Sequence, residues 1–204
     1  SSSNNDGEGE MPRILMVAEK PSIAKAMAEA LSGRRGPRQR RGISRALPVF
    51  EFVSDSFQPV NDANDGKPTK CIVTVTSVVG HIFSLGFDTK NQTQSQDPQD
   101  YFHLPVVKQE ESTSSKLRVI DHLRALAGES DHMVLWLDCD PEGENIAHEV
   151  MAITRQAIDN NNEGENRIHR ARFSAISPKA LRDAFASLEQ PDPALSRSVD
   201  ARQE

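Results

Sequence analysis

The stretch VLWLDCDPEGEN, residues 134–145, places four carboxylate side chains within seven positions, directly after a run of apolar residues. The apolar part is typical of a buried β-strand, and the acidic part begins where that strand ends. Carboxylates held this close repel one another and resist ionisation unless a cation joins them. We therefore predict a cation site here, with a solvated acidic turn as the weaker alternative.

The order of residues in the acidic part favours Mg²⁺, with Mn²⁺ as a substitute. In an extended segment residues two apart point the same way, so Asp138 and Asp140 are expected to project together. Pro141 then turns the chain, Glu142 follows two residues after Asp140, and Gly143 permits tight geometry before the next helix. Several carboxylate oxygens without a neighbouring histidine or thiolate suit a hard ion that also recruits phosphates.

Apolar strands and amphipathic helices alternate along most of the chain. Strands are predicted at residues 13–18, 48–54, 71–78, 132–138 and 166–174, and helices at residues 23–31, 116–128, 143–158, 177–188 and 191–204. Ser22 and Ser177 are expected to cap the helices that follow them. Strands that are apolar on both faces and alternate with helices predict a mostly parallel α/β sheet flanked by helices.

Three segments between these elements are predicted to be irregular. Residues 61–68 are dense in turn residues and are expected to connect two strands as a hairpin. Residues 34–45 contain six arginines without periodicity, which indicates a mobile loop; a solvated loop is favoured over phosphate binding, which stays open. Residues 88–115 are polar and are interpreted as a long surface excursion.

Polar residues also follow two other predicted strands, as the acidic segment follows the strand at residues 132–138. Glu19 and Lys20 come after the first strand, and His81 comes after the third. Because ligands bind beyond the carboxyl ends of the strands in such sheets, we expect one common rim. A carboxyl group there can exchange a proton with a reacting oxygen, and an ammonium group can offset charge on phosphate. His81 considered alone is more typical of a residue that caps a tight turn.

Arg170 and Arg172 alternate with Ala171 and Phe173, which places both arginines on one face of their predicted strand. A guanidinium group suits contact with phosphate, but a salt bridge to the neighbouring acids is an almost equal alternative. Both interpretations stay open at this stage.

Composition limits the class of protein only loosely. The net charge of −6 argues mildly against a non-specific nucleic-acid binder, although the charge is unevenly placed. No apolar run approaches the roughly 18 residues of a membrane helix, and the polar residues 1–10 are interpreted as a disordered leader. Cys71 and Cys139 lie in apolar runs, so core packing in a reducing, intracellular environment is expected for both.

Five segments together carry a resemblance to a known family. They are LMVAEKPSIAKAMAEALSG, TSVVGHIFSLGF, VLWLDCDPEGEN, RARFSAIS and SVDARQE, in that order. The chain resembles the type IA topoisomerases, and most of all their eukaryotic topoisomerase III-beta branch, from about Arg13 to Glu204. The resemblance implies a Rossmann-like Toprim domain over residues 11–176 and the first helices of a following α-helical domain over residues 177–204.

The resemblance also implies roles for individual residues. Glu19 corresponds to the catalytic acid or base of the family and Lys20 to the lysine that stabilises the charged transition state. Asp138, Asp140 and Glu142 correspond to the Mg²⁺ ligands of the D-x-D-x-E motif. The nucleic-acid-binding positions of the family correspond to His81, Arg170, Arg172 and Arg202. Pro141 departs from the family, which often carries lysine or arginine there.

The implied activity is transient cleavage and resealing of one strand of DNA, with RNA as a second substrate, for strand passage without ATP. The family uses a tyrosine nucleophile, whereas the only tyrosine here is Tyr101, in a polar segment outside the family motifs. The nucleophile is expected beyond Glu204, so this chain is predicted to be inactive alone. The implied partners are the remaining domains and an auxiliary scaffold protein, and the implied location is the nucleus and the cytoplasm.

Two other functions remain as alternatives. A stand-alone Toprim nuclease or primase-type enzyme would use metal ions alone to activate the attacking group, but it would not require the SVDARQE segment. A non-catalytic interaction module would have lost acidic residues, whereas Glu19 and all three acids of the D-x-D-x-E motif are present.

Overall fold

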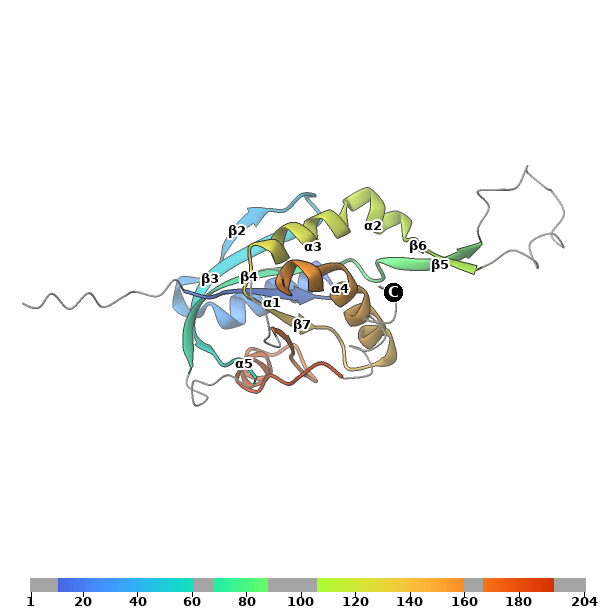
Figure 1. Ribbon diagram of the computed structural model, residues 1–204. Coiled ribbons are helices and arrows are strands. Elements are labelled where there is room, and N and C mark those ends of the chain that lie inside the picture. Colours follow the sequence, from blue (N-terminus) through green and yellow to red (C-terminus); the bar gives the residue numbers. More distant parts are fainter. Residues whose placement is uncertain (1–10, 61–67, 88–105, 160–166, 193–204) are drawn as a thin grey trace, which may run out of the picture.

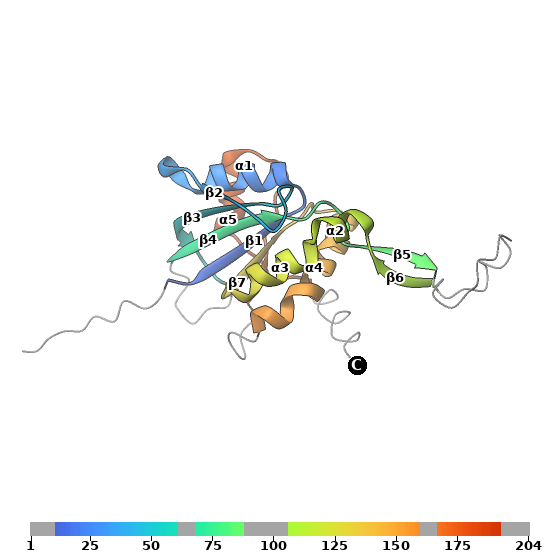
Figure 2. The ribbon, with the colours of Figure 1, turned by 90° about the horizontal axis from the view of Figure 1, so that it is seen from above.

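The computed structural model describes residues 11–60, 68–87, 106–159 and 167–192. A six-stranded sheet in the order β2-β3-β4-β1-β7-β8 lies between two layers of helices (Figure 1, Figure 2). Its strands are β1 (Arg13–Ala18), β2 (Arg38–Arg41), β3 (Pro48–Phe57), β4 (Thr69–Ser77), β7 (His132–Trp136) and β8 (Ile168–Arg170). Strands β4, β1, β7 and β8 run parallel to one another, β3 runs antiparallel to β4, and β2 runs antiparallel to β3. The predicted α/β class is confirmed.

Helices cover both faces of the sheet. One face carries α1 (Pro21–Leu31) and α5 (Pro178–Ala186), and the other carries α3 (Val119–Gly128) and α4 (Pro141–Asp159). In β1, Leu15 and Val17 pack in the core beneath α3 and α4, while Ile14, Met16 and Ala18 pack in the core beneath α1 and α5. Both faces of this strand are therefore buried, which explains its unbroken apolar sequence.

The N-termini of α1 and α5 test the two helix caps predicted from the sequence. Ser177 caps α5 as predicted, because its Oγ accepts a hydrogen bond from the Ala180 amide at 3.2 Å and Pro178 occupies the first helical position. The prediction that Ser22 caps α1 was wrong. The helix begins at Pro21 after Lys20, because the fixed φ of proline already suits the first turn.

The arginine-rich segment is a strand and a short helical turn where a mobile loop was predicted. A 3₁₀ turn covers Gly33–Arg35, and β2 pairs with β3 from Arg38 opposite Glu51 to Arg41 opposite Pro48. The prediction failed because an edge strand needs only backbone pairing on one side, so it can carry charged residues without apolar alternation.

The predicted surface excursion at residues 88–115 is also partly corrected. Strand β6 (Val106–Glu110) pairs with β5 (Phe83–Phe87), and this two-stranded ribbon projects from the body (Figure 1, Figure 2). Helix α2 (Ser112–Leu117) follows. The helix predicted at 116–128 is divided between α2 and α3 by Arg118, whose φ of 56° is left-handed.

The strand predicted at residues 166–174 is shorter in the structure, where β8 ends at Arg170. The antiparallel strands β3 and β4 were predicted correctly as a pair, but the connection at 61–67 lies outside the described residues. Residues 1–10, Tyr101 and the predicted helix at 191–204, with Arg202, also lie wholly or largely outside them. In the described ranges, no helix has the length and apolar character needed to cross a membrane.

Candidate active site

The carboxyl ends of β4, β1 and β7 meet at one rim of the sheet. The register pairs Ala18, the last residue of β1, with Ser77 on one side and Trp136 on the other. Each polar group that follows these strands therefore emerges at the same level. A cleft of about 470 Å³ opens there, lined by Glu19, Lys20, Pro21, Val79, Gly80, Asp138, Asp140 and Glu142. The structure thus brings together the five residues expected to carry catalysis and metal binding.

Glu19 and Lys20 form an ion pair at the wall of this cleft. Glu19 is buried, with 6% of its surface exposed, and its Oε1 lies 3.0 Å from Lys20 Nζ. The pKa of Lys20 is raised, first by the hydrogen bond to Glu19 and by its charge, with smaller contributions from Asp138 and Glu142. Lys20 is therefore held as a cation with its ammonium group in solvent, next to a shielded carboxylate.

The acidic turn depends on Gly143, because there is no room for a side chain at this position. A Cβ on Gly143 would lie 2.2 Å from the Asp138 carbonyl oxygen, which is far inside van der Waals contact. The Gly143 amide also donates a hydrogen bond to Asp140 Oδ1 at 2.7 Å. Gly143 belongs to the first turn of α4, which begins at Pro141, and not to a turn before the helix as predicted. The positive end of the helix therefore faces the carboxylates.

The side chains at the rim fit a divalent ion by their chemistry. Asp138, Asp140, Glu142 and Glu19 offer only carboxylate oxygens, the donors that Mg²⁺ prefers. As they stand, the described residues contain no group of three or more histidine, cysteine, aspartate or glutamate side chains placed to hold a metal ion.

Arg170 holds the acidic turn through hydrogen bonds to its backbone and to Glu144. It is 1% exposed, and its guanidinium donates to the carbonyl oxygens of Leu135, Ala171 and Asp138 at 3.2, 2.9 and 3.0 Å. The same group donates to Glu144 Oε1 at 3.0 Å. Of the two interpretations left open by the sequence, the structure shows the salt bridge. Arg170 thereby fixes the backbone from which Asp138 projects.

Arg172 also contacts Glu144, but its side chain is exposed to solvent. It comes after the end of β8, and its guanidinium pairs with Glu189 Oε2 at 2.8 Å and with Glu144 Oε1 at 3.5 Å. The hydrogen bond to Glu189 is the main cause of its raised pKa. The two arginines share Glu144, an acid to which the sequence pattern gave no separate role.

His81 links the rim to a buried acid. Its Nε2 lies 3.9 Å from Glu142 Oε1, and its Nδ1 lies 3.5 Å from Oε1 of Glu149. Glu149 is 3% exposed and its Oε2 accepts a hydrogen bond from the Ile82 amide at 2.7 Å. Sequence reasoning missed Glu149. The available signal was its spacing of seven residues from Glu142, which is two turns along one helix face.

The two cysteines differ in environment. Cys71 is buried in β4 as expected, and burial raises its pKa to about 12. The prediction of core packing for Cys139 was wrong, because Cys139 is exposed. The chain leaves the sheet after Trp136, so Cys139 lies in the exposed turn before α4 and not in the strand.

Comparison with known proteins identifies the class of this domain. Residues 14–176 match the family model of the Toprim domain, and the chain belongs to that family. Toprim domains of topoisomerases bind divalent metal ions, in agreement with the oxygen donors at the rim.

The relatives are topoisomerases of both the alpha and the beta branch. The chain is 41% identical over 193 residues to DNA topoisomerase 3-alpha of Arabidopsis thaliana and 38% identical over 193 residues to DNA topoisomerase 3-beta of the same plant. It is 37% identical over 195 residues to human DNA topoisomerase 3-beta-1. These alignments cover 94%, 94% and 95% of this chain but 19%, 20% and 21% of the relatives, so the chain spans about a fifth of their length.

Proposed function

We propose that this chain supplies the metal-binding and acid–base half of a type IA topoisomerase active site. The substrate is single-stranded DNA, with RNA as a second substrate, and the reaction needs no ATP. The observation that carries the proposal is the cleft itself. It gathers a shielded Glu19, a cationic Lys20 and three further carboxylates at the ligand-binding end of the sheet. The proposed location is intracellular, in the nucleus and the cytoplasm.

Each side chain then has a distinct task. Asp138, Asp140 and Glu142 hold Mg²⁺, which when bound offsets the negative charge of the phosphodiester group and orients it. Glu19 exchanges the proton of the sugar oxygen that departs during cleavage and returns during resealing. Lys20, which the neighbouring acids keep protonated, offsets the charge that develops on the phosphate.

The nucleophile is the part that this cleft lacks. No tyrosine is among the described residues that line it. In the proposed reaction a tyrosine hydroxyl from another part of the protein attacks phosphorus and displaces the 3′ sugar oxygen, giving a 5′-phosphotyrosyl link and a free 3′ hydroxyl. Attack by that hydroxyl reverses the step and reseals the strand, so no external energy source is consumed.

A cleavage assay tests this division of labour. End-labelled single-stranded DNA and RNA are incubated with the 204-residue chain and Mg²⁺ or Mn²⁺, and the products are separated by size. We expect no cutting, because no tyrosine is among the described residues that line the cleft. Metal-dependent cutting that disappears in Glu19→Gln but persists in Glu29→Gln, an exposed acid on α1, would contradict the proposal and favour a stand-alone nuclease.

A further inference from the structure

A band of arginines lies on and beside β2, the strand at one edge of the six-stranded sheet. We call it the arginine edge, and it consists of Arg34, Arg35, Arg38, Arg40, Arg41 and Arg45. Five of these side chains are exposed, and Arg40 is half-buried. Within the described ranges only Arg40 forms an ion pair, through Nε at 2.7 Å from Glu51 Oε1. A chain with a net charge of −6 therefore concentrates unneutralised guanidinium groups in one place.

The turn after β2 is fixed against a buried histidine. His122 is 2% exposed, and its Nδ1 accepts a hydrogen bond from the Ile43 amide at 3.4 Å. Its Nε2 lies 2.8 Å from Thr76 Oγ1, which in turn donates to the Pro48 carbonyl at 3.2 Å. A Cβ on Gly42 would come within 2.6 Å of the His122 ring, so the backbone passes directly over it. Arg41 and Arg45 therefore flank a turn that packs against the buried His122 ring.

The strand register places this support beside the cleft. Arg41 lies opposite Pro48, and continuing the β3–β4 register from Phe50 opposite Val75 brings Pro48 level with Ser77, which pairs with Ala18. Arg41 is therefore three strand spacings, roughly 14 Å, from the end of β1. A hollow of about 420 Å³ lies at this position, lined by Gln39, Arg40, Arg41, Arg45 and Pro48.

We propose that the arginine edge is a second binding site, for the phosphodiester backbone of the single strand whose reacting phosphate lies in the cleft. The proposal rests on the proposed function for its ligand class but does not depend on the metal. A guanidinium fork can donate two hydrogen bonds to one phosphate. Contacts to phosphate alone carry no sequence information, so the arginine edge binds strands of any sequence. A few nucleotides span the distance between the two sites.

The competing explanation is protection of the sheet. Charged residues on an edge strand prevent two sheets from pairing edge to edge. That role accounts for the charges within β2 itself. It gives no reason for Arg45, which lies beyond the strand on the turn held by His122, or for the hollow that this residue shares with Arg41.

Strand binding in EDTA separates these explanations. A fluorescein-labelled oligothymidylate is titrated with the 204-residue chain, with a triple variant Arg38→Ala, Arg41→Ala and Arg45→Ala, and with a control triple Lys25→Ala, Lys179→Ala and Arg182→Ala. Both triples remove three positive charges, but the control residues lie on α1 and α5. We expect the arginine triple to weaken binding about tenfold or more at moderate salt, and the slope of log K against log salt to become shallower by about 2. The control should change the affinity by less than about twofold.

Several outcomes would overturn the proposal. The first is no strand binding by the parent chain, and the second is an equal loss of affinity in both triple variants. The third is unchanged affinity in the arginine triple, whether or not size-exclusion chromatography shows that this variant forms dimers. If the arginine triple does not fold, the single variant Arg45→Glu, on the turn, must show the loss instead. A separate Mg²⁺ titration of the parent chain distinguishes the two proposals. Strand binding without Mg²⁺ binding contradicts the proposed function alone, and Mg²⁺ binding with unchanged strand affinity in the triple contradicts the arginine edge alone.

Discussion

The two ends of the sheet both carry polar groups and a hollow of similar size, but they differ in which titratable side chains are buried and which reach solvent. At the carboxyl ends of the strands the cleft of about 470 Å³ is lined by acids and Lys20. At the amino ends a hollow of about 390 Å³ is lined by Met11, Pro12, Arg13, Gly128, Glu129, Asp131 and Arg167. Size does not distinguish the two. The difference lies in what surrounds the titratable groups at each end.

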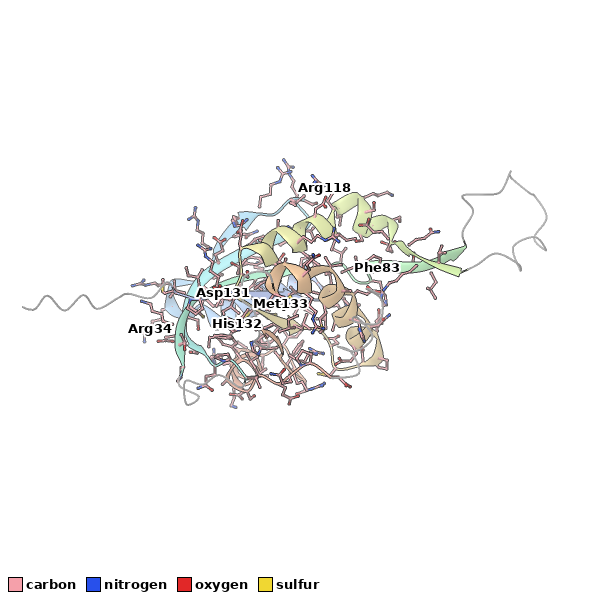
Figure 3. The ribbon with its side chains drawn as sticks, viewed as in Figure 1. Arg34, Phe83, Arg118, Asp131, His132 and Met133 are labelled. Carbon is pink, nitrogen blue, oxygen red and sulfur yellow. The ribbon has the colours of Figure 1, made fainter. Side chains whose placement is uncertain are left out.

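At the amino ends two histidines are packed into the core. His132 and His169 are buried, with Nδ1 of the first 3.1 Å from Nε2 of the second, and Phe57 packs edge-on against both rings (Figure 3 labels His132 beside Asp131 and Met133). Burial lowers the pKa of His169 to about 3, with smaller contributions from His132 and Arg167. The His169 imidazole therefore stays neutral near pH 7. At the rim, by contrast, Asp140, Glu142 and the Lys20 ammonium reach solvent, where a ligand can meet them.

The comparison would be broken most severely at Arg170, which is buried more deeply than Glu19. Arg170→Met should lower the free energy of unfolding by about 3–5 kcal/mol, because it removes the buried partner of Glu144 and the guanidinium donor to the Ala171 and Asp138 carbonyl oxygens. Arg172→Met removes the more exposed ion pair to the same Glu144 and should lower the free energy of unfolding by less than about 1 kcal/mol. Urea unfolding of both variants measures this, and similar small losses would show that Arg170 does not brace the turn.

Acid should weaken the amino end of the sheet. The unfolded chain protonates His169 near pH 6.5, whereas the folded chain does so only near the pKa of about 3, so unfolding takes up a proton between these values. The stability from neutral His169 is complete above pH 6.5 and falls below it, by about 2–3 kcal/mol at pH 4.5.

Urea unfolding at pH 7 and pH 4.5 checks the acid effect. In His169→Asn the difference between the two pH values should shrink by about 2–3 kcal/mol. His122, whose pKa burial lowers to about 4, should add a separate loss over the upper part of the same range, and this loss persists in the variant. An unchanged pH dependence in His169→Asn would contradict the account of the amino end.

The shape of the acidic turn can be tested with a pair of glycines. Gly143→Ala should cost about 1–3 kcal/mol and displace Asp138, because the new Cβ collides with the backbone of that residue. Gly128→Ala, at the end of α3, meets nothing within 4 Å and should be neutral or stabilising by up to about 1 kcal/mol. Thermal unfolding compares the two, and an equal response would mean that the turn is not tightly constrained.

The smallest effect concerns the thiols and leaves stability unchanged. A thiol reagent under native conditions should modify Cys139 alone, because Cys71 is buried with a pKa of about 12. Mass spectrometry should show one adduct per folded chain and two after unfolding. Modification of Cys71 in the folded chain would contradict its packing in β4.

The sequence was sufficient for features that follow from local pattern and simple topology. Apolar runs predicted β1, β4 and β7, and parallel pairing then placed Glu19 and Asp138 at one rim. Features set by long-range packing could not be predicted in this way. Arg170 is buried because acceptors from β7, from the turn after β7 and from α4 surround it. Glu149 meets His81 only once α4 packs beneath the rim. Strand β2 was missed because backbone pairing alone holds an edge strand, whose side chains need no pattern.

The central claim is that the acids at the rim form a divalent metal site. Calorimetric titration with Mg²⁺ tests it directly, on the parent chain, on Asp138→Asn with Asp140→Asn, and on a control, Asp121→Asn with Asp183→Asn, which removes two exposed acids from α3 and α5. We predict saturable binding in the parent and the control and none in the rim variant, with circular dichroism unchanged in all three. Equal Mg²⁺ affinity in the rim variant and the parent would contradict the site.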